Sequence, residues 1–365
     1  MLNIMNTLSI YLVRACSVAV LYLTATSTAL SQLVAVTAGE YTKVGLSGGQ
    51  FLKVGVGARG TAMAGAYSAL SNDLTAIFWN PAGLAQVKSY GADFSQTFWL
   101  AGTTHSFAAA SIPLSDKFKF AASFVSFSSG DIPITTTADP TGSAGGLYSV
   151  NDIAVGATLA GYLTEQFSFG VTARYVDHGF SSMSASGVSF DIGTRYKTGV
   201  KGLDLAFSIN NLGTAQAYTG SDLTKTVLPA PGLNSSQVDA ILATNSFDIP
   251  LSFRAGLGVN MFEGLIADKH EVDADGTIVH DWVVGADFET FADVPEQFAI
   301  GTEYTFREFV SLRAGYRFGQ SEFGLSGGVG LVYRTGSFDG RLDYSVSPSA
   351  NLGMVNRVSV SFFID

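Results

Sequence analysis

The histidines and one acidic run are the residues whose types could support metal or acid–base chemistry. The four histidines, His105, His178, His270 and His280, show no metal-ligand spacing, so we expect solvated histidines. Residues 273–276 (Asp-Ala-Asp-Gly) resemble the start of a calcium loop, but the later ligands do not follow, which favours a turn. No Gly-x-Ser-x-Gly element occurs. We therefore expect neither an enzyme, nor a metal site, nor a cofactor.

Three glycines have the spacing of a dinucleotide-binding loop. Gly55, Gly57 and Gly60 spell Gly-x-Gly-x-x-Gly, but such a loop needs a strand–turn–helix within a βαβ unit, and nothing downstream has that pattern. We interpret these glycines as sites where a compact segment folds closely against a wall. The net charge of −10, without a basic patch, argues against a nucleic-acid partner.

From about residue 88 onward, apolar and polar residues alternate with period two. In the run 166–178 the odd positions from Phe167 to Tyr175 are apolar or aromatic, whereas the even positions hold Ser168, Gly170, Thr172 and Arg174. The same pattern recurs in 251–259, 282–288, 310–318 and 358–362. Such alternation predicts strands that separate two different environments.

A membrane barrel explains these strands better than a soluble β-sandwich. The predicted strands are about 9–13 residues long, which suits a tilted transmembrane strand, and their apolar face is rich in the 27 Phe and 14 Tyr of the chain. No apolar run long enough for a spanning helix follows the N-terminal region. Because lipid cannot satisfy an open sheet edge, we predict an all-β fold, a closed transmembrane antiparallel β-barrel of about fourteen strands.

The strand boundaries follow from the alternation. We predict strands at 89–100, 103–113, 117–128, 150–163, 166–178, 185–198, 202–212, 247–262, 278–291, 296–306, 309–318, 322–335, 338–347 and 355–364. The connections after the third, fifth, seventh and thirteenth strands are predicted to be long outer loops, notably 129–149 and 213–246, with a short helix near 235–243. The connection 263–277 should be a short periplasmic turn and is long, so either it is elaborated or the strand count slips there.

The polar face of the strands is predicted to point into the lumen. Isolated charges in such a wall would be costly, so we expect cross-strand ion pairs or a wet lumen. The candidate lumen charges are Arg174, Arg195, Arg254, Arg313, Arg317, Asp287 and Glu303.

The first 31 residues have the composition of a signal peptide. Arg14 supplies the positive charge, the run 15–23 is a short apolar core, and Ala29-Leu30-Ser31 offers a cleavage site. The only cysteine, Cys16, lies inside this segment, so the exported chain would form no disulfide. We predict export to the periplasm, followed by insertion into the outer membrane.

Residues 32–87 do not alternate, and we predict that they form a plug ahead of the barrel, 88–365. Pro81 fixes its own φ and Asn80 can bond nearby backbone, so Asn80, Pro81, Ala82, Gly83 and Leu84 are predicted to form a structural corner rather than a binding site. Together with 55–65, Asn72-Asp73 and Phe78-Trp79, this motif resembles the N-terminal signature of the PorV/PorQ family of Bacteroidetes-type bacteria. That family in turn resembles the FadL transporters, and the resemblance implies a fourteen-stranded barrel with a plugged lumen.

The resemblance leaves alternative functions open. The resemblance to PorV-like proteins implies that this chain is a component or cargo-binding partner of type IX protein secretion. It would then contact secreted cargo or other secretion-system proteins through the long outer loops. The alternative is a FadL-like channel for long-chain fatty acids or other hydrophobic compounds, and the third is a structural barrel. Because the inward face is charged and rich in glycine, secretion is the first hypothesis. Outer-membrane lipid is the partner expected in every case.

Overall fold

A computed structural model describes residues 47–87, 89–143, 145–227, 237–263, 271–273, 276–320 and 322–364. All of them belong to one compact unit, Val44–Asp365. The predicted signal peptide and residues 32–46 of the predicted plug lie outside the described residues, so both remain predictions. Within the described part, no helix is long and apolar enough to cross a membrane.

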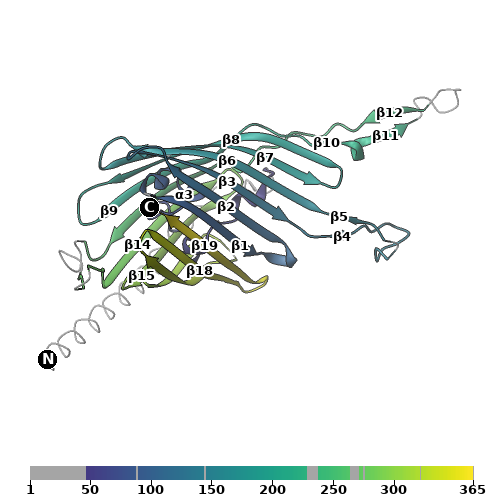
Figure 1. The fold of residues 1–365 in the computed structure, drawn as a ribbon. Helices are drawn as coiled ribbons and strands as arrows, with labels where there is room; N and C mark the ends of the chain where they lie inside the picture. The colour runs from purple at the N-terminus through teal and green to yellow at the C-terminus, as the bar shows by residue number, and fades with distance from the viewer. Residues whose placement is uncertain are drawn as a thin grey trace, which may run out of the picture. The chain divides into compact units, whose positions relative to one another are not determined.

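Most of the described chain is antiparallel β-sheet (Figure 1). The long strands are β1 (Tyr90–Phe98), β2 (Thr104–Pro113), β3 (Phe118–Ser128), β6 (Val150–Tyr162), β7 (Phe167–Phe180), β8 (Met183–Lys197), β9 (Leu203–Gly213), β13 (Ser252–Asn260), β14 (His280–Phe291), β15 (Val294–Phe306), β16 (Val310–Phe318), β17 (Leu325–Thr335), β18 (Phe338–Ser349) and β19 (Gly353–Ile364). Each corresponds to one predicted strand, so the predicted fold class is confirmed.

These fourteen strands close into a barrel. Each pairs with its neighbour along the chain, the first strand β1 pairs with the last strand β19, and the ring continues through β8–β9 and β9–β13. The short strand β10 (Thr219–Gly220) adds to β8 outside the ring. Closure leaves no backbone edge unpaired, which is what a lipid solvent requires. The long connection at 263–277 joins β13 to β14 without a slip in the strand count.

The two faces of the wall differ as the alternation predicts. Outward side chains such as Phe94, Phe298 and Leu312 are about half exposed, whereas inward Glu303 and Arg313 are buried. An apolar surface of this kind around a barrel matches hydrocarbon rather than water. The charges therefore belong to the interior, where they meet one another and the chain that enters the lumen.

The two longest loops leave the same end of the barrel, which we term the loop end; the opposite end is the turn end. The loop 129–149 carries β4 (Ile132–Pro133) and β5 (Leu147–Tyr148), and the loop 214–251 carries β10, η4 (Ser221–Leu223), β11 (Thr224–Val227) and β12 (Val238–Ile241) (Figure 1). A further short helix, η3 (Leu100–Gly102), lies between β1 and β2. Both chain ends of the barrel lie at the turn end.

Three local predictions were wrong. The loops after the fifth and thirteenth strands are short, because β7 and β8 are joined by Ser181 and Ser182 alone, and residues 350–352 join β18 to β19. The helix predicted near 235–243 is absent from its described part, where β12 pairs with β11 instead. A helix this short has no packing partner to offset the cost of nucleation, whereas the hairpin satisfies its backbone directly.

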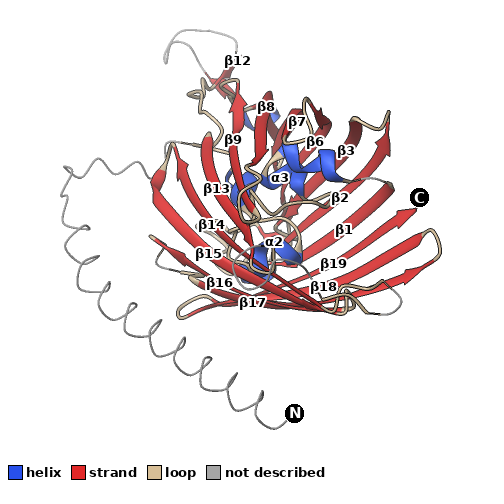
Figure 2. Ribbon diagram, turned by 90° about the vertical axis from the view of Figure 1, so that its left-hand side faces the viewer, coloured by secondary structure: helices blue, strands red, loops and turns tan. Residues whose placement is uncertain are grey.

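Residues 47–87, which we term the N-terminal segment, fold inside the ring of strands (Figure 2). They form η1 (Gln50–Lys53), α2 (Ala58–Ala62), α3 (Ala76–Trp79) and η2 (Pro81–Gln86). α2 packs against β16–β19, whereas η2 packs against β3 and β6–β8. The segment thus touches opposite sides of the lumen.

Candidate functional site

The lumen and the N-terminal segment form the candidate functional site, because charged, apolar and glycine surfaces meet there. At its centre a cluster of buried charges joins the segment to the wall. Arg59 of α2 donates two hydrogen bonds to Glu303 of β15, at 2.6 and 2.8 Å. Glu303 also accepts from Arg313 of β16, which donates to Asp343 of β18 at 2.6 Å. The cluster therefore fastens α2 to β15, β16 and β18 of the wall.

Arg59 also holds the segment together from within. Its guanidinium donates to Asn72 and lies 3.5 Å from the Asp73 carboxylate, which accepts a 2.6 Å bond from the Tyr67 hydroxyl. Burial raises the pKa of Tyr67 well above its usual value, so the phenol stays protonated and remains a donor. Burial alone would lower the pKa of Arg59, but the Glu303 carboxylate outweighs it and the pKa is raised. The Arg59 guanidinium therefore keeps its charge at neutral pH.

The other predicted lumen charges of β13–β16 also face the segment. Arg317 donates to the Ala64 carbonyl at 2.9 Å, and Asp287 accepts from the Ser68 backbone at 3.1 Å. Arg254 lies over the Trp79 ring, 4.8 Å from its centroid, and pairs with Glu289 at 2.5 Å. Each of these wall charges therefore has a partner that the sequence alone could not assign.

Two predicted charges lie on the other side of the lumen. Arg195 of β8 pairs with Asp204 at 2.6 Å and donates to the Ser71 carbonyl at 3.1 Å. Arg174 of β7 pairs with Asp191 at 2.6 Å and donates to Asn211 at 3.0 Å. Asn211 has a positive φ of 61° and lies where the β8–β9 ladder shifts register. This ion pair thus fills a local break in the wall, away from the central cluster.

Glycines form the part of the wall on which the segment rests. Gly258, Gly285, Gly301 and Gly315 are register partners across β13, β14, β15 and β16, and they make a continuous inward row. A Cβ on Gly301 would lie 2.5 Å from the Met63 carbonyl oxygen, which is closer than a Cβ can approach. The segment from Met63 to Leu70 lies along this row. The wall therefore has no side chains where the backbone of the segment must lie.

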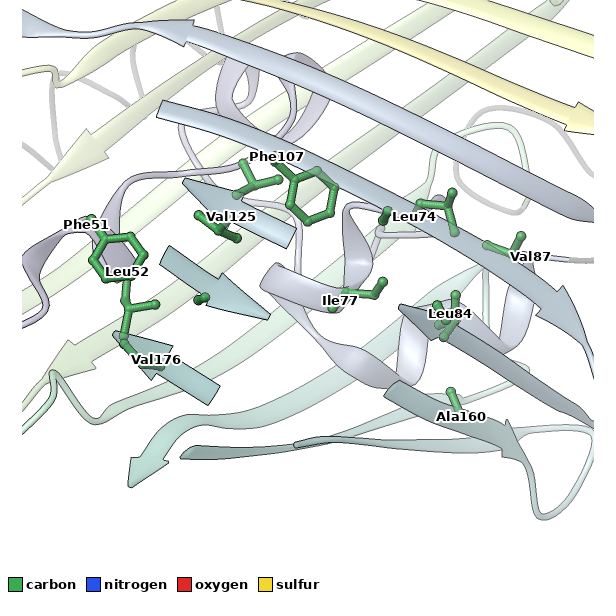
Figure 3. Close-up of a cluster of buried hydrophobic side chains, with 14 of the residues drawn as sticks. Phe51, Leu52, Leu74, Ile77, Leu84, Val87, Phe107, Val125, Ala160 and Val176 are labelled. Atoms are coloured by element: carbon green, nitrogen blue, oxygen red, sulfur yellow. The ribbon is translucent and has the colours of Figure 1, made fainter. Parts of the chain in front are cut away.

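The opposite side of the lumen holds a buried apolar cluster among polar side chains such as Lys119, Thr172 and Arg174. Phe107 of β2, Val125 of β3, Ala160 of β6 and Val176 of β7 point inward and are buried. They form one cluster with apolar residues of the N-terminal segment, which we term the apolar seam (Figure 3). The segment contributes Phe51, Leu52, Val56, Leu74, Ile77, Leu84, Ala85 and Val87. The seam extends from the loop end to the turn end, which corrects the view of the lumen as uniformly charged.

The Asn-Pro-Ala-Gly-Leu motif lies against the wall of β7 and β8. The Asn80 side chain accepts from the Ala82 backbone at 3.1 Å and donates to the Ser68 and Thr194 carbonyls at 3.2 and 3.1 Å. Gly170 and Gly193 of the wall face Pro81 and Asn80 so closely that a Cβ would not fit. The contacts are internal to the fold, so the structural role predicted for Asn80, Pro81, Ala82, Gly83 and Leu84 remains the simplest interpretation.

Two cavities lie at the ends of the lumen. The loop-end cavity, of about 80 Å³, is lined by residues including Lys53, Trp79, Trp99, Arg254, Arg317, Phe323 and Arg357. The turn-end cavity, of about 270 Å³, is lined by residues including Asn72, Gln86, Val87, Arg334, Phe338, Arg341 and Phe363. Between them the seam holds a space of only about 10 Å³. A benzene-sized cavity is roughly 150 Å³, so the described space at the seam is too small for such a molecule.

In the described part of the chain, the histidines and the Gly-x-Gly-x-x-Gly run make packing contacts within the fold. His105 and His178 are buried, so the expectation of solvated histidine was wrong for both; His178 lies 3.2 Å from Asp152 and packs on Phe51. His270 lies outside the described residues. Gly55, Gly57 and Gly60 pack against Thr61, Thr75 and Trp79 rather than forming a loop after a strand. Among the described residues, no cluster of possible metal ligands occurs.

The sequence analysis missed several residues of this site. Arg59, Lys53 and Arg357 were not singled out, because the first two lie outside the alternating region and the third lies in a strand with few other charges. The glycine row leaves a weak signal, since at least one inward glycine occurs in each of four strands that follow one another along the chain. Which glycines are neighbours depends on the register, which periodicity does not reveal.

Comparisons with known proteins support the fold. No protein-family model and no curated protein matches the sequence. The Pseudomonas putida toluene transporter TodX matches with a TM-score of 0.53 and 14% identity, over 84% of this chain and 97% of that one. The CymD monoaromatic hydrocarbon channel matches with a TM-score of 0.52 and 11% identity, over 86% and 98% of the two chains. A Pseudomonas aeruginosa FadL homologue matches with a TM-score of 0.50 and 13% identity, over 85% and 98%.

At these identities the likeness establishes the fold and not the function. The predicted relation to FadL-like barrels is therefore confirmed at the level of architecture. The PorV/PorQ part of the predicted resemblance is not confirmed by these comparisons.

Proposed function

We propose that this protein is an outer-membrane channel for small hydrophobic molecules and that the N-terminal segment closes it until the segment moves. The outward apolar belt fits insertion in a membrane. Barrels of the same fold are described as a toluene transporter and a monoaromatic hydrocarbon channel. The proposal takes up the FadL-like alternative and puts it ahead of the secretion hypothesis.

The apolar seam is the observation that carries the proposal. A hydrophobic molecule needs a continuous apolar path through the lumen. Contact with apolar side chains lowers its free energy relative to water, whereas contact with charged groups that must lose their own water does not. The seam supplies one wall of such a path. Val87 of the seam and Phe363, which packs against it, also line the turn-end cavity. The charge cluster around Glu303 lies across the lumen at β15–β18, whereas Arg174 of β7, paired with Asp191, lines the small space beside the seam. A shift of the segment away from β2, β3, β6 and β7 would therefore open a route lined along one side by the apolar residues of the seam.

A disulfide that ties the segment to the wall tests this role. The Thr61 and Ser345 hydroxyl oxygens lie 2.9 Å apart, one on α2 and the other on β18. The double variant Thr61→Cys/Ser345→Cys can be oxidised to lock the segment and reduced to release it. The control Thr305→Cys/Ser311→Cys joins β15 to β16 through hydroxyls 3.0 Å apart and leaves the segment free.

The readout is the initial uptake rate of radiolabelled toluene by cells that carry each variant in the outer membrane. We expect oxidation of the first variant to abolish protein-dependent uptake and reduction to restore it, while the control transports in both states. Equal uptake by the locked and released forms would rule out gating by the segment. No protein-dependent uptake by the unmodified chain would rule out the channel itself.

The secretion hypothesis rests on the long loops at the loop end, and no contact in the structure favours it. A deletion strain separates the two functions. Loss of toluene or fatty-acid uptake with normal release of secreted cargo would support the channel, whereas the reverse result would restore the secretion hypothesis.

A further inference from the structure

The loop-end cavity contains an arginine that has no acidic partner. Arg357 of β19 is 5% exposed, and its Nη1 donates to the Ser347 hydroxyl at 3.2 Å. Its Nε is buried and makes no hydrogen bond with any described residue. No ion pair of Arg357 with an acidic side chain occurs among the described residues. Because an unpaired buried charge is costly, this guanidinium indicates a site that an anion completes.

The other cationic side chains at this cavity outnumber their acidic partners. Arg254 pairs with Glu289 at 2.5 Å, and Arg317 lies 3.7 Å from the same carboxylate. The Nε and Nη1 of Arg254 are buried without a hydrogen-bond partner. Lys53 alone has its own acid, Asp293, at 2.6 Å. The described lining of the cavity thus includes four cationic side chains and no acidic one.

Aromatic rings stand beside these cations. The Arg357 guanidinium lies 5.6 Å from the centre of the Trp99 ring, and Trp99 lies 5.6 Å from Phe323 at an angle of 38°. Both rings belong to connections at the loop end, where the cavity meets the exterior. The cavity, at about 80 Å³, is smaller than the roughly 150 Å³ that holds benzene. The cavity therefore has room for the charged group of a ligand but not for an aromatic ring, which would remain at the cavity opening beside Trp99 and Phe323.

We propose that the loop-end cavity binds the carboxylate of a small aromatic acid. Guanidinium groups pair with carboxylates through two parallel hydrogen bonds, and the Nε of Arg357 is free to donate one of them. Trp99 and Phe323 line the cavity, and a ligand ring can pack against them better than a straight alkyl chain can. The inference rests on the proposed channel function and adds to its substrates small aromatic molecules that carry one negative charge.

Binding to the purified, full-length protein in detergent micelles tests the site, with tryptophan fluorescence as the readout. The probes are benzoate, the uncharged benzyl alcohol, octanoate and inorganic phosphate. We expect benzoate to bind most tightly. In Arg357→Gln its affinity should fall about tenfold or more, the loss expected for one charged hydrogen bond. Arg334→Gln, at the turn end, is the matched control and should bind benzoate normally.

The same variants show whether any loss is structural. Arg357→Gln removes an unpaired charge, so its heat-modifiable mobility should be as stable as that of the parent. Arg357→Lys keeps the charge and should retain part of the affinity. Equal binding of benzyl alcohol or phosphate, or octanoate binding as tight as benzoate, would overturn the proposal. So would benzoate binding that is unchanged in Arg357→Gln.

Failure here is distinct from failure of the channel. If the disulfide-locked protein still transports toluene while benzoate binding depends on Arg357, the gating mechanism is wrong and the site stands. If gating holds and benzoate does not bind, the site is wrong and the channel stands.

Discussion

At the scale of single residues, the lumen depends on arginines that join elements far apart in the sequence. Arg313 lies between Glu303 and Asp343, and Glu303 also accepts from Arg59 of the N-terminal segment. Removing one arginine leaves a buried carboxylate without a positive partner. This lowers the stability of the fold more than replacing the whole cluster by apolar residues would. The cluster therefore couples the stability of the wall to the position of the segment.

We expect Arg313→Leu to destabilise the protein by about 3–5 kcal/mol, the usual cost of breaking a buried ion pair. The measurement is the temperature at which the folded, fast-migrating form is lost on a gel. Arg307→Leu is the matched control, since Arg307 pairs with Asp273 on the exposed turn end and such pairs contribute little. Equal transition temperatures for the parent and Arg313→Leu would show that the cluster is solvated.

At the scale of elements, the glycine row sets how closely the segment approaches the wall. Four strands contribute one glycine each, and their registers align them under residues 63–70. Any side chain there would displace the backbone of the segment. The row thus explains part of the high glycine content of the chain, 41 residues, which turns alone do not require.

We expect Gly301→Ala to push the segment off the wall, because its Cβ would overlap the Met63 carbonyl and neither backbone can yield easily. Gly327→Ala is the matched control, since its Cβ would meet only the Arg313 carbonyl oxygen at 3.6 Å. Limited proteolysis of the purified protein should cleave residues 47–87 faster in Gly301→Ala than in the control. Identical cleavage rates would show that the wall accommodates the methyl group.

At the scale of the whole molecule, the barrel and the long loops are separable. β11 and β12 pair only with each other and not with the fourteen-stranded ring. Closure of the ring instead depends on β1–β19 and on β8–β9, which lie elsewhere. The hairpin is therefore available for binding without a role in the fold.

We expect replacement of residues 223–242 by a short Gly-Ser linker to preserve heat-modifiable mobility in the outer-membrane fraction, as well as toluene uptake. Cargo release, measured in the same cells, should also be unchanged if the protein is a channel. Lost cargo release with intact uptake would assign the loops to secretion. Lost mobility would show that the loop supports the barrel.

Much of the fold was predictable because alternation is a local property. Phe298, Ile300 and Leu312 had to face lipid once their neighbours were polar, and Arg313 and Glu303 had to face inward. Strand number and boundaries followed from the same pattern. The loop lengths at Ser181–Ser182 and at 350–352 did not, since β7, β8, β18 and β19 extend beyond the clearest alternation.

The sequence by itself therefore determined the class of fold, the strand count and the side of the wall on which each residue lies, because a period of two is read along the chain. Only the tertiary structure decided which inward residues meet. The apolar seam of Phe107, Val125 and Val176, the pairing of Arg59 with Glu303 and the unpaired Arg357 all depend on register and closure. Register and closure bring together residues that are hundreds of positions apart in the sequence. A pattern that is local in the sequence carries no information about such pairs.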